Sequence, residues 1–377
     1  MRERQVRVLV TGADGFIGRN FVVRLAEEGG FAVSRFTRTH ARDLLSKAVA
    51  GADVVVHLAG ENRPPVESAF AAVNEGLTRD ISDAIAEASI REGRGIGLIL
   101  ASSIHADRDT PYGRSKLAAE RLVTDLVGRC STPAVIYRFP GVFGKWCRPN
   151  YNSVVATFCH NAANGLPIIV NDPSVVLNLV YIDDVVASLI SAVRSMRPGL
   201  SVGTVDPVYS LTVGELAQRV SSFESMRGSL MVDSVGTGLT RALYSTYISY
   251  LPPSRFSYPV PQHADPRGVF VEMLKTPHSG QFSFFTAHPG VTRGGHYHHT
   301  KTEKFLVIRG EALFRFRSLL TDERIELRTS GESPQIVDTI PGWAHDITNE
   351  GDGEMIVMLW ANENFDRLKP DTFAAEV

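Results

Sequence analysis

The sequence of 377 residues is longer than one hydrophobic core usually supports, so two domains are expected. Hydrophobic residues make up 44% of the chain and charged residues 21%, and the formal net charge is -2, values typical of a soluble globular protein. This balance provides no basic footprint for nucleic acid or an acidic membrane surface, and no apolar run of about 18 residues is present to span a bilayer.

The cysteines indicate a reducing compartment. Cys130, Cys147 and Cys159 are odd in number and have no CxxC spacing. The N-terminal segment Met-Arg-Glu-Arg-Gln leads directly into the first predicted strand, without an apolar signal segment. We therefore expect a cytoplasmic protein.

A buried strand is predicted over Val6–Thr11, and a glycine-rich turn follows it and leads into an apolar-periodic helix. In a dinucleotide-binding turn of this kind the first glycine permits a sharp bend, the second lets the backbone approach a pyrophosphate, and the third lets helix and strand pack closely. The helix N-terminus then faces the anion. The predicted cofactor-binding residues of the turn are Gly12, Gly15, Phe16, Ile17 and Gly18.

The end of the second predicted strand indicates which nicotinamide cofactor binds. An acidic residue about 20 positions past the glycines would bind the ribose 2′-hydroxyl of NAD. Instead Arg35, Arg38 and Arg42 precede the first acid, Asp43. We predict NADPH, with Arg38 binding the 2′-phosphate; solvated basic side chains are the alternative.

The chain up to about residue 240 alternates short apolar strands with helical periodicity. This alternation is typical of α/β proteins with a doubly wound, Rossmann-type parallel sheet. After the first strand, further strands are predicted at Phe31–Arg35, Asp53–Leu58, Gly97–Ala101 and Ala134–Phe139.

Tyr112 and Lys116 open the helix after the fourth strand and, four residues apart, share one face of it. An ammonium group beside the phenol would lower the pKa of the tyrosine and make it a general acid that protonates a ketone oxygen as hydride arrives. Ser102 and Ser103 at the strand end could hold that oxygen. An ordinary surface pair is the alternative, but the glycine turn and the serines favour catalysis.

With His57-Leu-Ala-Gly60 and Tyr181-Ile-Asp-Asp-Val185, these motifs resemble the extended short-chain dehydrogenases/reductases that act on nucleotide sugars, over roughly residues 5–240. The resemblance implies catalytic roles and cofactor contacts for a set of matching residues. The catalytic set is Ser103, Tyr112 and Lys116, and the added cofactor contacts are Leu58, Ala59, Tyr112 and Lys116.

Two departures from that family narrow the chemistry. Sugar 4,6-dehydratases carry an Asp-Glu pair just after the serine, and Ile104-His105 at this place disfavours dehydration. Ser103 and Tyr112 are nine positions apart, a shorter interval than is usual in the family, so the loop over the site must differ.

Near residue 250 the sequence becomes proline-rich: four prolines between residues 251 and 261 exclude helix and central strand alike. We predict an NADP-binding domain at 1–245, a linker at 246–260 and a metal-binding β domain at 261–377. Strands separated by Gly, Pro, Asp and Asn turns suit an antiparallel barrel. They are predicted at Gln281–Ala287, Lys304–Ile308, Ala312–Arg317 and Met355–Trp360.

Four residues of the C-terminal part have metal-ligand spacing. His296, His298 and Glu303 lie between two turn glycines, and His345 follows Pro341-Gly342. Alternate strand residues share a face, and three imidazoles with one carboxylate suit zinc, iron, nickel or manganese. The pattern resembles the cupin family in every spacing of its two motifs, which implies a jelly-roll barrel with one divalent metal ion per chain.

A chain that combines these two parts, with connecting sequences such as Asp265-Pro-Arg-Gly268, resembles the bifunctional capsule and O-antigen enzymes of the CapF/WbjC type over essentially the full length. The resemblance implies that the cupin epimerises C3 of UDP-2-acetamido-2,6-dideoxy-β-L-arabino-hexos-4-ulose. The other domain would then reduce the C4 ketone with NADPH to UDP-2-acetamido-2,6-dideoxy-β-L-talose, in UDP-N-acetyl-L-fucosamine synthesis. Zn²⁺ and a homodimer are implied in the same way.

Several assignments stay open. Polar groups that would reject substrates lacking hydroxyls are predicted to contact the UDP-sugar: Lys145, Asn150, Asn152 and Asn178. The candidate bases for the C3 proton are Lys301, His299 and Asp265. The main alternative function is a monofunctional NADPH-dependent UDP-4-ketosugar reductase with a structural, dimerising cupin; an NADPH-binding redox sensor is disfavoured by the Ser-Tyr-Lys set.

Overall fold

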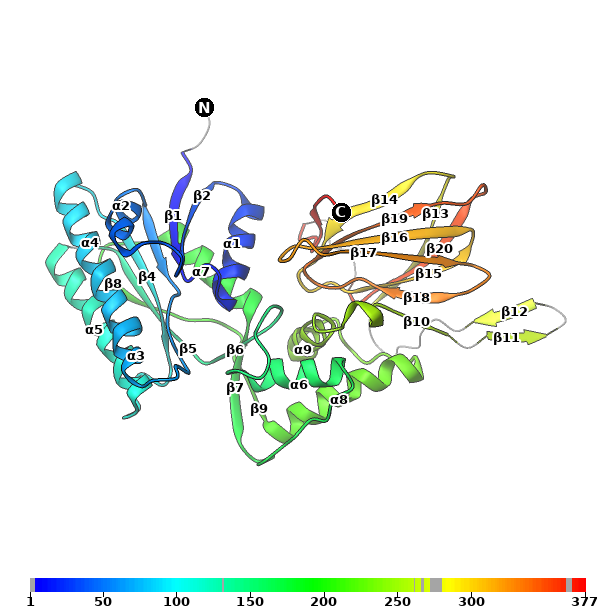
Figure 1. Ribbon diagram of the computed structural model, residues 1–377, viewed down its shortest axis with the longest axis horizontal. Helices are drawn as coiled ribbons and strands as arrows, with labels where there is room; N and C mark the ends of the chain where they lie inside the picture. Colours follow the sequence, from blue (N-terminus) through cyan, green and yellow to red (C-terminus); the bar gives the residue numbers. More distant parts are fainter. Residues whose placement is uncertain (1–3, 131, 261, 266–267, 272–279, 364–367) are drawn as a thin grey trace. The chain divides into compact units, whose positions relative to one another are not determined.

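The computed structural model describes residues 4–377 apart from 131, 261, 266–267, 272–279 and 364–367 (Figure 1). The chain forms two compact units, the first comprising Met1–Ser153 and Leu177–Ser210 and the second Val154–Val176 and Leu211–Val377. The predicted domain limits at 245 and 261 stay a prediction, because a compact unit is not by itself a segment that folds alone.

The first unit contains a six-stranded parallel sheet. Its strands are β1 (Val6–Thr11), β2 (Phe31–Phe36), β3 (Val54–His57), β4 (Gly97–Ser103), β5 (Ala134–Phe139) and β8 (Leu200–Gly203). They are arranged in the order β2-β1-β3-β4-β5-β8. β1 and β5 have the predicted bounds, and the other predicted strands differ by one or two residues at an end.

Helices cover both faces of this sheet (Figure 1). On one face α2 (Leu45–Ala50), α4 (Leu77–Glu92) and α5 (Pro111–Cys130) pack together, and on the other α1 (Phe16–Glu28) packs with α7 (Ile182–Ser195). Alternate strand residues such as Leu9, Val55 and Leu98 are fully buried in the core under α2, α4 and α5. The predicted doubly wound fold is confirmed. Shorter elements nearby are η1 (Arg42–Leu44), α3 (Ser68–Phe70), η2 (Ala71–Gly76), β6 (Gly141–Phe143), β7 (Val176–Tyr181) and β9 (Tyr209–Thr212).

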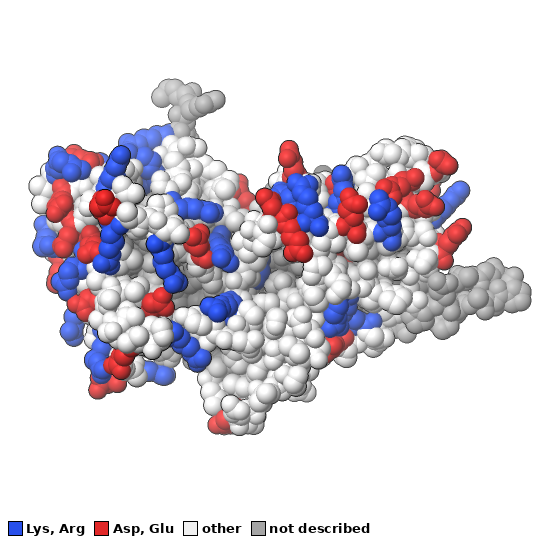
Figure 2. All heavy atoms as spheres, in the orientation of Figure 1, with Lys and Arg blue, Asp and Glu red and all other residues white. Residues whose placement is uncertain are grey.

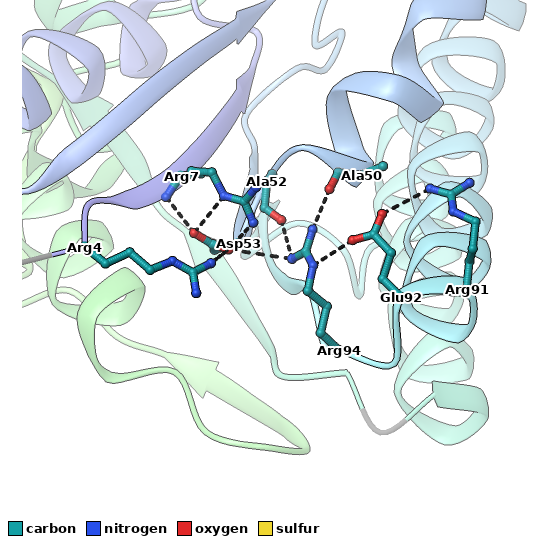
Figure 3. A network of polar contacts seen from close by, with 8 residues as sticks. All are labelled: Arg4, Arg7, Ala50, Ala52, Asp53, Arg91, Glu92 and Arg94. Atoms are coloured by element: carbon teal, nitrogen blue, oxygen red, sulfur yellow. Dashed lines mark hydrogen bonds and ion pairs between the residues drawn. The ribbon is translucent and has the colours of Figure 1, made fainter.

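A network of charged groups lies at the end of the sheet where the strands β1 and β3 begin (Figure 3). Asp53 accepts hydrogen bonds from the Arg7 backbone N (2.9 Å) and Nη2 (2.6 Å), and it pairs with Arg4 at 3.1 Å and Arg94 at 3.6 Å. The Arg7 side-chain bond outweighs burial and lowers the pKa of Asp53 to about 2. Arg94 also donates to the Ala52 carbonyl at 2.7 Å, so the network ties the strand starts to the segment after α4.

The surface carries both signs of charge. On the face of the first unit seen in Figure 2, basic and acidic side chains are interspersed rather than gathered by sign, as suits a formal net charge of -2. Among the residues that the structure describes, no helix has the length and apolar character needed to cross a membrane.

Two five-stranded antiparallel sheets form the β part of the second unit, here called the barrel (Figure 1). The orders are β10-β18-β15-β20-β13 and β17-β16-β19-β14-β21, and β11 pairs with β12 as a hairpin. The bounds are β10 (Ser257–Pro259), β11 (Gln262–Asp265), β12 (Gly268–Val271), β13 (Gln281–Ala287), β14 (Thr292–Tyr297), β15 (Glu303–Arg309), β16 (Glu311–Ser318), β17 (Arg324–Ser330), β18 (Gln335–Asp338), β19 (Trp343–Asn349), β20 (Met355–Ala361) and β21 (Phe373–Ala374). The predicted antiparallel β domain is confirmed, and the four strands predicted in it match within one residue at each end.

Three helices belong to the second unit: α6 (Val154–Ala163), α8 (Val213–Ser229) and α9 (Gly238–Ile248). Thr212 and Glu215 form a capping box that starts α8. The segment predicted as a linker contains the last turn of α9, the 3-10 turn η3 (Pro253–Arg255) and β10. β10 lies at a sheet edge, where a proline costs no ladder hydrogen bond.

A buried cluster of charges joins α8 to the barrel. Asp338 accepts hydrogen bonds from Lys304 Nζ at 2.6 Å and from Arg227 Nη1 at 2.9 Å, and Arg227 also donates to the Arg255 carbonyl at 2.6 Å. The Asp338 side chain is 4% exposed and that of Lys304 is 3% exposed. Burial is the largest single effect and would lower the pKa of Lys304, but the Asp338 carboxylate together with Tyr244 and Tyr258 outweighs burial and raises it. The lysine therefore stays charged in the interior.

Replacing Asp338 with Asn should lower the free energy of unfolding by about 3–5 kcal/mol, because it leaves two buried cations without their counter-charge. Urea unfolding of the intact chain measures this. Asp322→Asn is the control: Asp322 is exposed, pairs with Arg317 at 2.9 Å and has a φ of 58° that Asn tolerates. That change should cost less than about 1 kcal/mol. Equal losses in the two variants would contradict the prediction.

Candidate active site and metal centre

The glycine turn between β1 and α1 lies against the segment that follows β3. Gly12 has a φ of 68°, and a Cβ atom built on it would lie 2.6 Å from the Ala59 backbone N. A Cβ on Gly18 would lie 2.2 Å from the Gly12 carbonyl oxygen, so neither position accepts a side chain. Gly15 caps α1, and Phe16 and Ile17 begin the helix. The structure thus brings the predicted turn together with Leu58 and Ala59.

The arginines predicted to select NADPH lie on and after β2. Arg38 has a side chain that is 94% exposed, with Nη1 3.7 Å from Glu61 Oε1. Arg42 pairs with Asp80 at 3.4 Å, and Arg35 is exposed on β2. Of the three arginines, Arg38 is the one that pairs with Glu61 in the segment after β3, and its role towards the 2′-phosphate stays a prediction.

The three predicted catalytic residues meet at the end of β4. α5 begins at Pro111, which places Tyr112 and Lys116 on one face of its first two turns. Ser103, the last residue of β4, forms a hydrogen bond with Tyr112. Lys116 Nζ donates to the Ala101 carbonyl of the same strand at 3.0 Å. A hydroxyl, a phenol and an ammonium group are thereby held on one strand end.

The pKa of Tyr112 differs from the sequence-based expectation. Burial raises it, and the hydrogen bond with Ser103 offsets the rise only in part, so the lowering expected from Lys116 is not observed. Burial lowers the pKa of Lys116 to about 8, against an opposing effect of Glu120. Tyr112 therefore holds its proton at neutral pH, as a proton donor must.

The two serines at the end of β4 have different surroundings. Ser102 Oγ donates to the Glu120 carboxylate, which also accepts from Arg138 Nη2 at 2.7 Å. Arg138 pairs with Asp107 of the short loop at 2.6 Å. Ser102 thus belongs to a polar network that runs from the buried Glu120 to the exposed Asp107, and Ser103 is the serine that contacts Tyr112.

Asn74 is a buried residue that none of the sequence motifs above includes. Its Oδ1 accepts from the Glu61 backbone N at 2.8 Å, and its Nδ2 donates to Ser115 Oγ at 3.0 Å. A Cβ on Gly60 would lie 3.0 Å from Asn74 Oδ1 and 3.1 Å from Lys116 Nζ. Asn74 therefore holds the segment after β3 against α5. It lies in the π-helical segment η2, a feature often found at functional sites that single-sequence patterns do not reveal.

The predicted substrate contacts have mixed surroundings. Lys145 is 1% exposed, and its ammonium group pairs with Asp183 of α7 at 2.7 Å. Asn150 has a φ of 54°, a left-handed conformation that Asn adopts more readily than most residues. Asn152 and Asn178 are exposed. Lys145 is thus already paired within the fold, and contact of these residues with substrate stays a prediction.

The four predicted metal ligands converge inside the barrel. The donor atoms of His296, His298, Glu303 and His345 all lie within 4.8 Å of one another. β14 and β19 are antiparallel neighbours in which His296 pairs with His345, after a register shift at Gly294. Glu303 begins β15 in the other sheet, so the cluster joins both sheets.

The protonation states of this cluster fit a divalent metal ion. Burial lowers the pKa of His296 to about 4 and also lowers that of His345. Burial would raise the pKa of Glu303, but the neighbouring side chains of His298, His345 and Lys301 bring it well below its usual value. Glu303 Oε2 lies 3.2 Å from His298 Nε2 and 3.7 Å from His345 Nε2, a buried atom with no hydrogen-bond partner among the described residues. Neutral imidazoles and an ionised carboxylate are the forms that bind metal.

The candidate bases have contacts of their own. Lys301 Nζ lies 3.2 Å from Glu303 Oε1 and donates to Thr372 Oγ1 at 3.0 Å. The His299 ring packs against Phe373, with ring centroids 5.1 Å apart. The Asp265 side chain lies outside the described residues. Lys301 is therefore bound to one of the predicted ligands.

Comparisons with known proteins cover the whole chain. Residues 8–205 match the NAD dependent epimerase/dehydratase family, and residues 263–373 match the polysaccharide biosynthesis C-terminal domain. The chain is 54% identical over 372 residues to the UDP-2-acetamido-2,6-beta-L-arabino-hexul-4-ose reductase of Pseudomonas aeruginosa, covering 99% of each chain.

Solved structures are similar to the whole chain or to its first part. The capsular polysaccharide assembling protein CapF from Staphylococcus aureus is 39% identical with a TM-score of 0.66, over 98% of this chain and 100% of that one. The Thermus thermophilus UDP-glucose 4-epimerase in complex with NAD is 21% identical with a TM-score of 0.50, over 58% of this chain and 84% of that one, a likeness of fold alone. The chain therefore belongs to the NAD-dependent epimerase/dehydratase family, in the group that also carries a polysaccharide biosynthesis C-terminal domain.

Proposed function

We propose that this protein is a bifunctional nucleotide-sugar enzyme of polysaccharide biosynthesis. The observation that carries the proposal is the 54% identity over 99% of both chains to a reductase of a UDP-4-ketosugar. The first unit would reduce the C4 ketone of a UDP-2-acetamido-2,6-dideoxy-hexos-4-ulose, and the barrel would epimerise C3. The expected product is UDP-2-acetamido-2,6-dideoxy-β-L-talose, on the way to UDP-N-acetyl-L-fucosamine.

In the first unit each residue has a distinct role towards the ketone. NADPH supplies the hydride when bound at the glycine turn. Tyr112 holds a proton at its phenol oxygen and gives it to the C4 oxygen, and Ser103 orients that oxygen through its hydroxyl. Lys116 donates a hydrogen bond to the Ala101 carbonyl. Its ammonium group lies beside Gly60, in the segment after β3 that packs against the glycine turn. The raised pKa of Tyr112 supports this assignment.

In the barrel, His296, His298, Glu303 and His345 would hold one divalent metal ion, for which we propose Zn²⁺. A bound Lewis acid polarises a carbonyl, and the C3 proton lies next to the C4 ketone. His298, Glu303 and His345 are buried and His296 is half-buried, which limits the access of competing water. In the alternative function, the four ligands fill the coordination sphere of the metal and the barrel only supports the reductase. Loss of C3 exchange when a ligand is removed would favour the bifunctional enzyme over this alternative.

We also propose that the protein is a homodimer, and the test is its molecular mass in solution.

Tyr112→Phe should remove NADPH oxidation but leave exchange of the C3 proton with solvent, because the two chemistries use different units. General acid catalysis contributes ~10²–10⁴-fold, so the loss should reach that range. NMR of the 4-ketosugar in deuterated water, with and without NADPH, follows both reactions. Tyr137→Phe, which removes a buried phenol bonded to Ser188, is the control. Reduction above about a tenth of the wild-type rate would argue against Tyr112 as the acid.

His298→Ala should lose metal and C3 exchange while reduction of a pre-epimerised substrate survives. Three remaining ligands form a weaker site. Metal analysis of the purified protein and NMR exchange measure the two effects. His288→Ala, an exposed histidine outside the cluster, is the matched control. Full metal occupancy with persistent exchange in His298→Ala would refute the ligand assignment.

Arg38→Asp should narrow or reverse the preference for NADPH over NADH by about 10- to 150-fold, since a charged contact with the 2′-phosphate is replaced by repulsion. C3 exchange should not change. Steady-state kinetics with both cofactors measure the ratio, and Arg79→Asp, an exposed charge reversal on α4, is the control. An unchanged ratio would move the assignment to Arg35 or Arg42.

A further inference from the structure

The last residues of the chain hold the loop between two predicted metal ligands. The loop 299–302 connects His298 to Glu303, and its residues are buried. Asp371, far along the sequence, lies against it. The Asp371 Oδ1 atom accepts a hydrogen bond from the His299 backbone N at 2.9 Å. Its Oδ2 accepts from the Thr300 N at 2.6 Å, the Thr300 Oγ1 at 3.0 Å and the Lys301 N at 2.7 Å.

This carboxylate satisfies three successive backbone donors that have no strand partner. Backbone N–H groups buried without a partner are costly, and three in a row form a concave site that favours an anion. The loop conformation therefore depends on a full negative charge at Asp371. Because the loop leads directly into Glu303, the first residue of β15, the same contact helps to fix the position of the Glu303 backbone.

The backbone of Asp371 also contacts a predicted metal ligand, His298, directly. Its carbonyl oxygen hydrogen-bonds with His298 Nδ1. A donor at Nδ1 leaves Nε2 with its lone pair free to bind metal, and this is the atom that lies 3.2 Å from Glu303 Oε2. The following strand β21 pairs with β14, where Ala374 is opposite His296. The segment 371–374 thus contacts two of the four predicted ligands, His298 and His296, and acts on Glu303 only through the loop 299–302.

We propose that Asp371 is a positioning residue of the metal centre, which preorganises His298 and Glu303 through the loop 299–302. The inference rests on the proposed metal site. Asp371 is proposed neither as a metal ligand nor as the base for the C3 proton, because its carboxylate oxygens already accept four hydrogen bonds.

The test is the affinity for Zn²⁺ alone, measured on the full-length chain by competition with a chromophoric chelator. Asp371→Asn keeps the shape but places an amide group against the loop donors, and we expect the dissociation constant to rise about 10- to 100-fold. Thr372→Val removes only the neighbouring contact with Lys301 and should stay within about threefold of wild type. An Asp371→Asn value within threefold of wild type would overturn the proposal.

A second measurement covers the case in which Asp371→Asn does not fold. In wild-type protein without metal, the amide hydrogens of His299, Thr300 and Lys301 should exchange slowly with solvent, because the carboxylate holds them; fast exchange there overturns the proposal. The two inferences fail differently. Wild-type protein that binds no Zn²⁺ would refute the metal site, and this inference with it, whereas tight wild-type binding with an unchanged Asp371→Asn refutes only the role of Asp371.

Discussion

The antiparallel pairing of β14 with β19 is the constraint on which the predicted metal site depends. It sets His296 opposite His345, two residues that are 49 positions apart in the sequence. A shift of one residue in this register would turn one histidine to the other face of the sheet, since side chains alternate. The register shift at Gly294, where a Cβ would lie 2.9 Å from the Asp346 Cα, keeps the two imidazoles on the same side. Glu303 then completes the cluster from the facing sheet.

Burial explains the electrostatics of both sites, with opposite outcomes for different groups. In the first unit it raises the pKa of Tyr112 and lowers that of Lys116, so the phenol keeps its proton while the ammonium group becomes easier to deprotonate. In the barrel it keeps His296 and His345 neutral. Glu303 and Lys304 stay charged because each has partners that outweigh the desolvation of its charge.

Buried charges also explain how the second unit is assembled. Arg227 belongs to α8, within the part that resembles a reductase, yet its partner Asp338 is a barrel residue. Ser245 of α9 likewise donates to the Thr300 carbonyl, next to the loop held by Asp371. The helices α8 and α9, which precede the proline-rich segment, therefore support the barrel and its loop 299–302, and both belong to the second unit.

The sequence by itself determined the local features. The glycine turn, the strands of the first sheet and the Tyr112–Lys116 spacing follow from short-range patterns, because chain stereochemistry and helix or strand periodicity act within a few residues. The four predicted metal ligands come from two such short motifs, and their grouping into one site was a prediction from the resemblance to cupins. The tertiary structure decided what distant segments do to one another. It separated Ser102, bound to Glu120, from Ser103, which meets Tyr112. It buried Asn74 against Ser115, beside Lys116, and brought Asp371 to the loop 299–302 between two predicted metal ligands. It also reversed the expected shift in the pKa of Tyr112, since desolvation depends on everything packed around a group and no spacing along the chain encodes it.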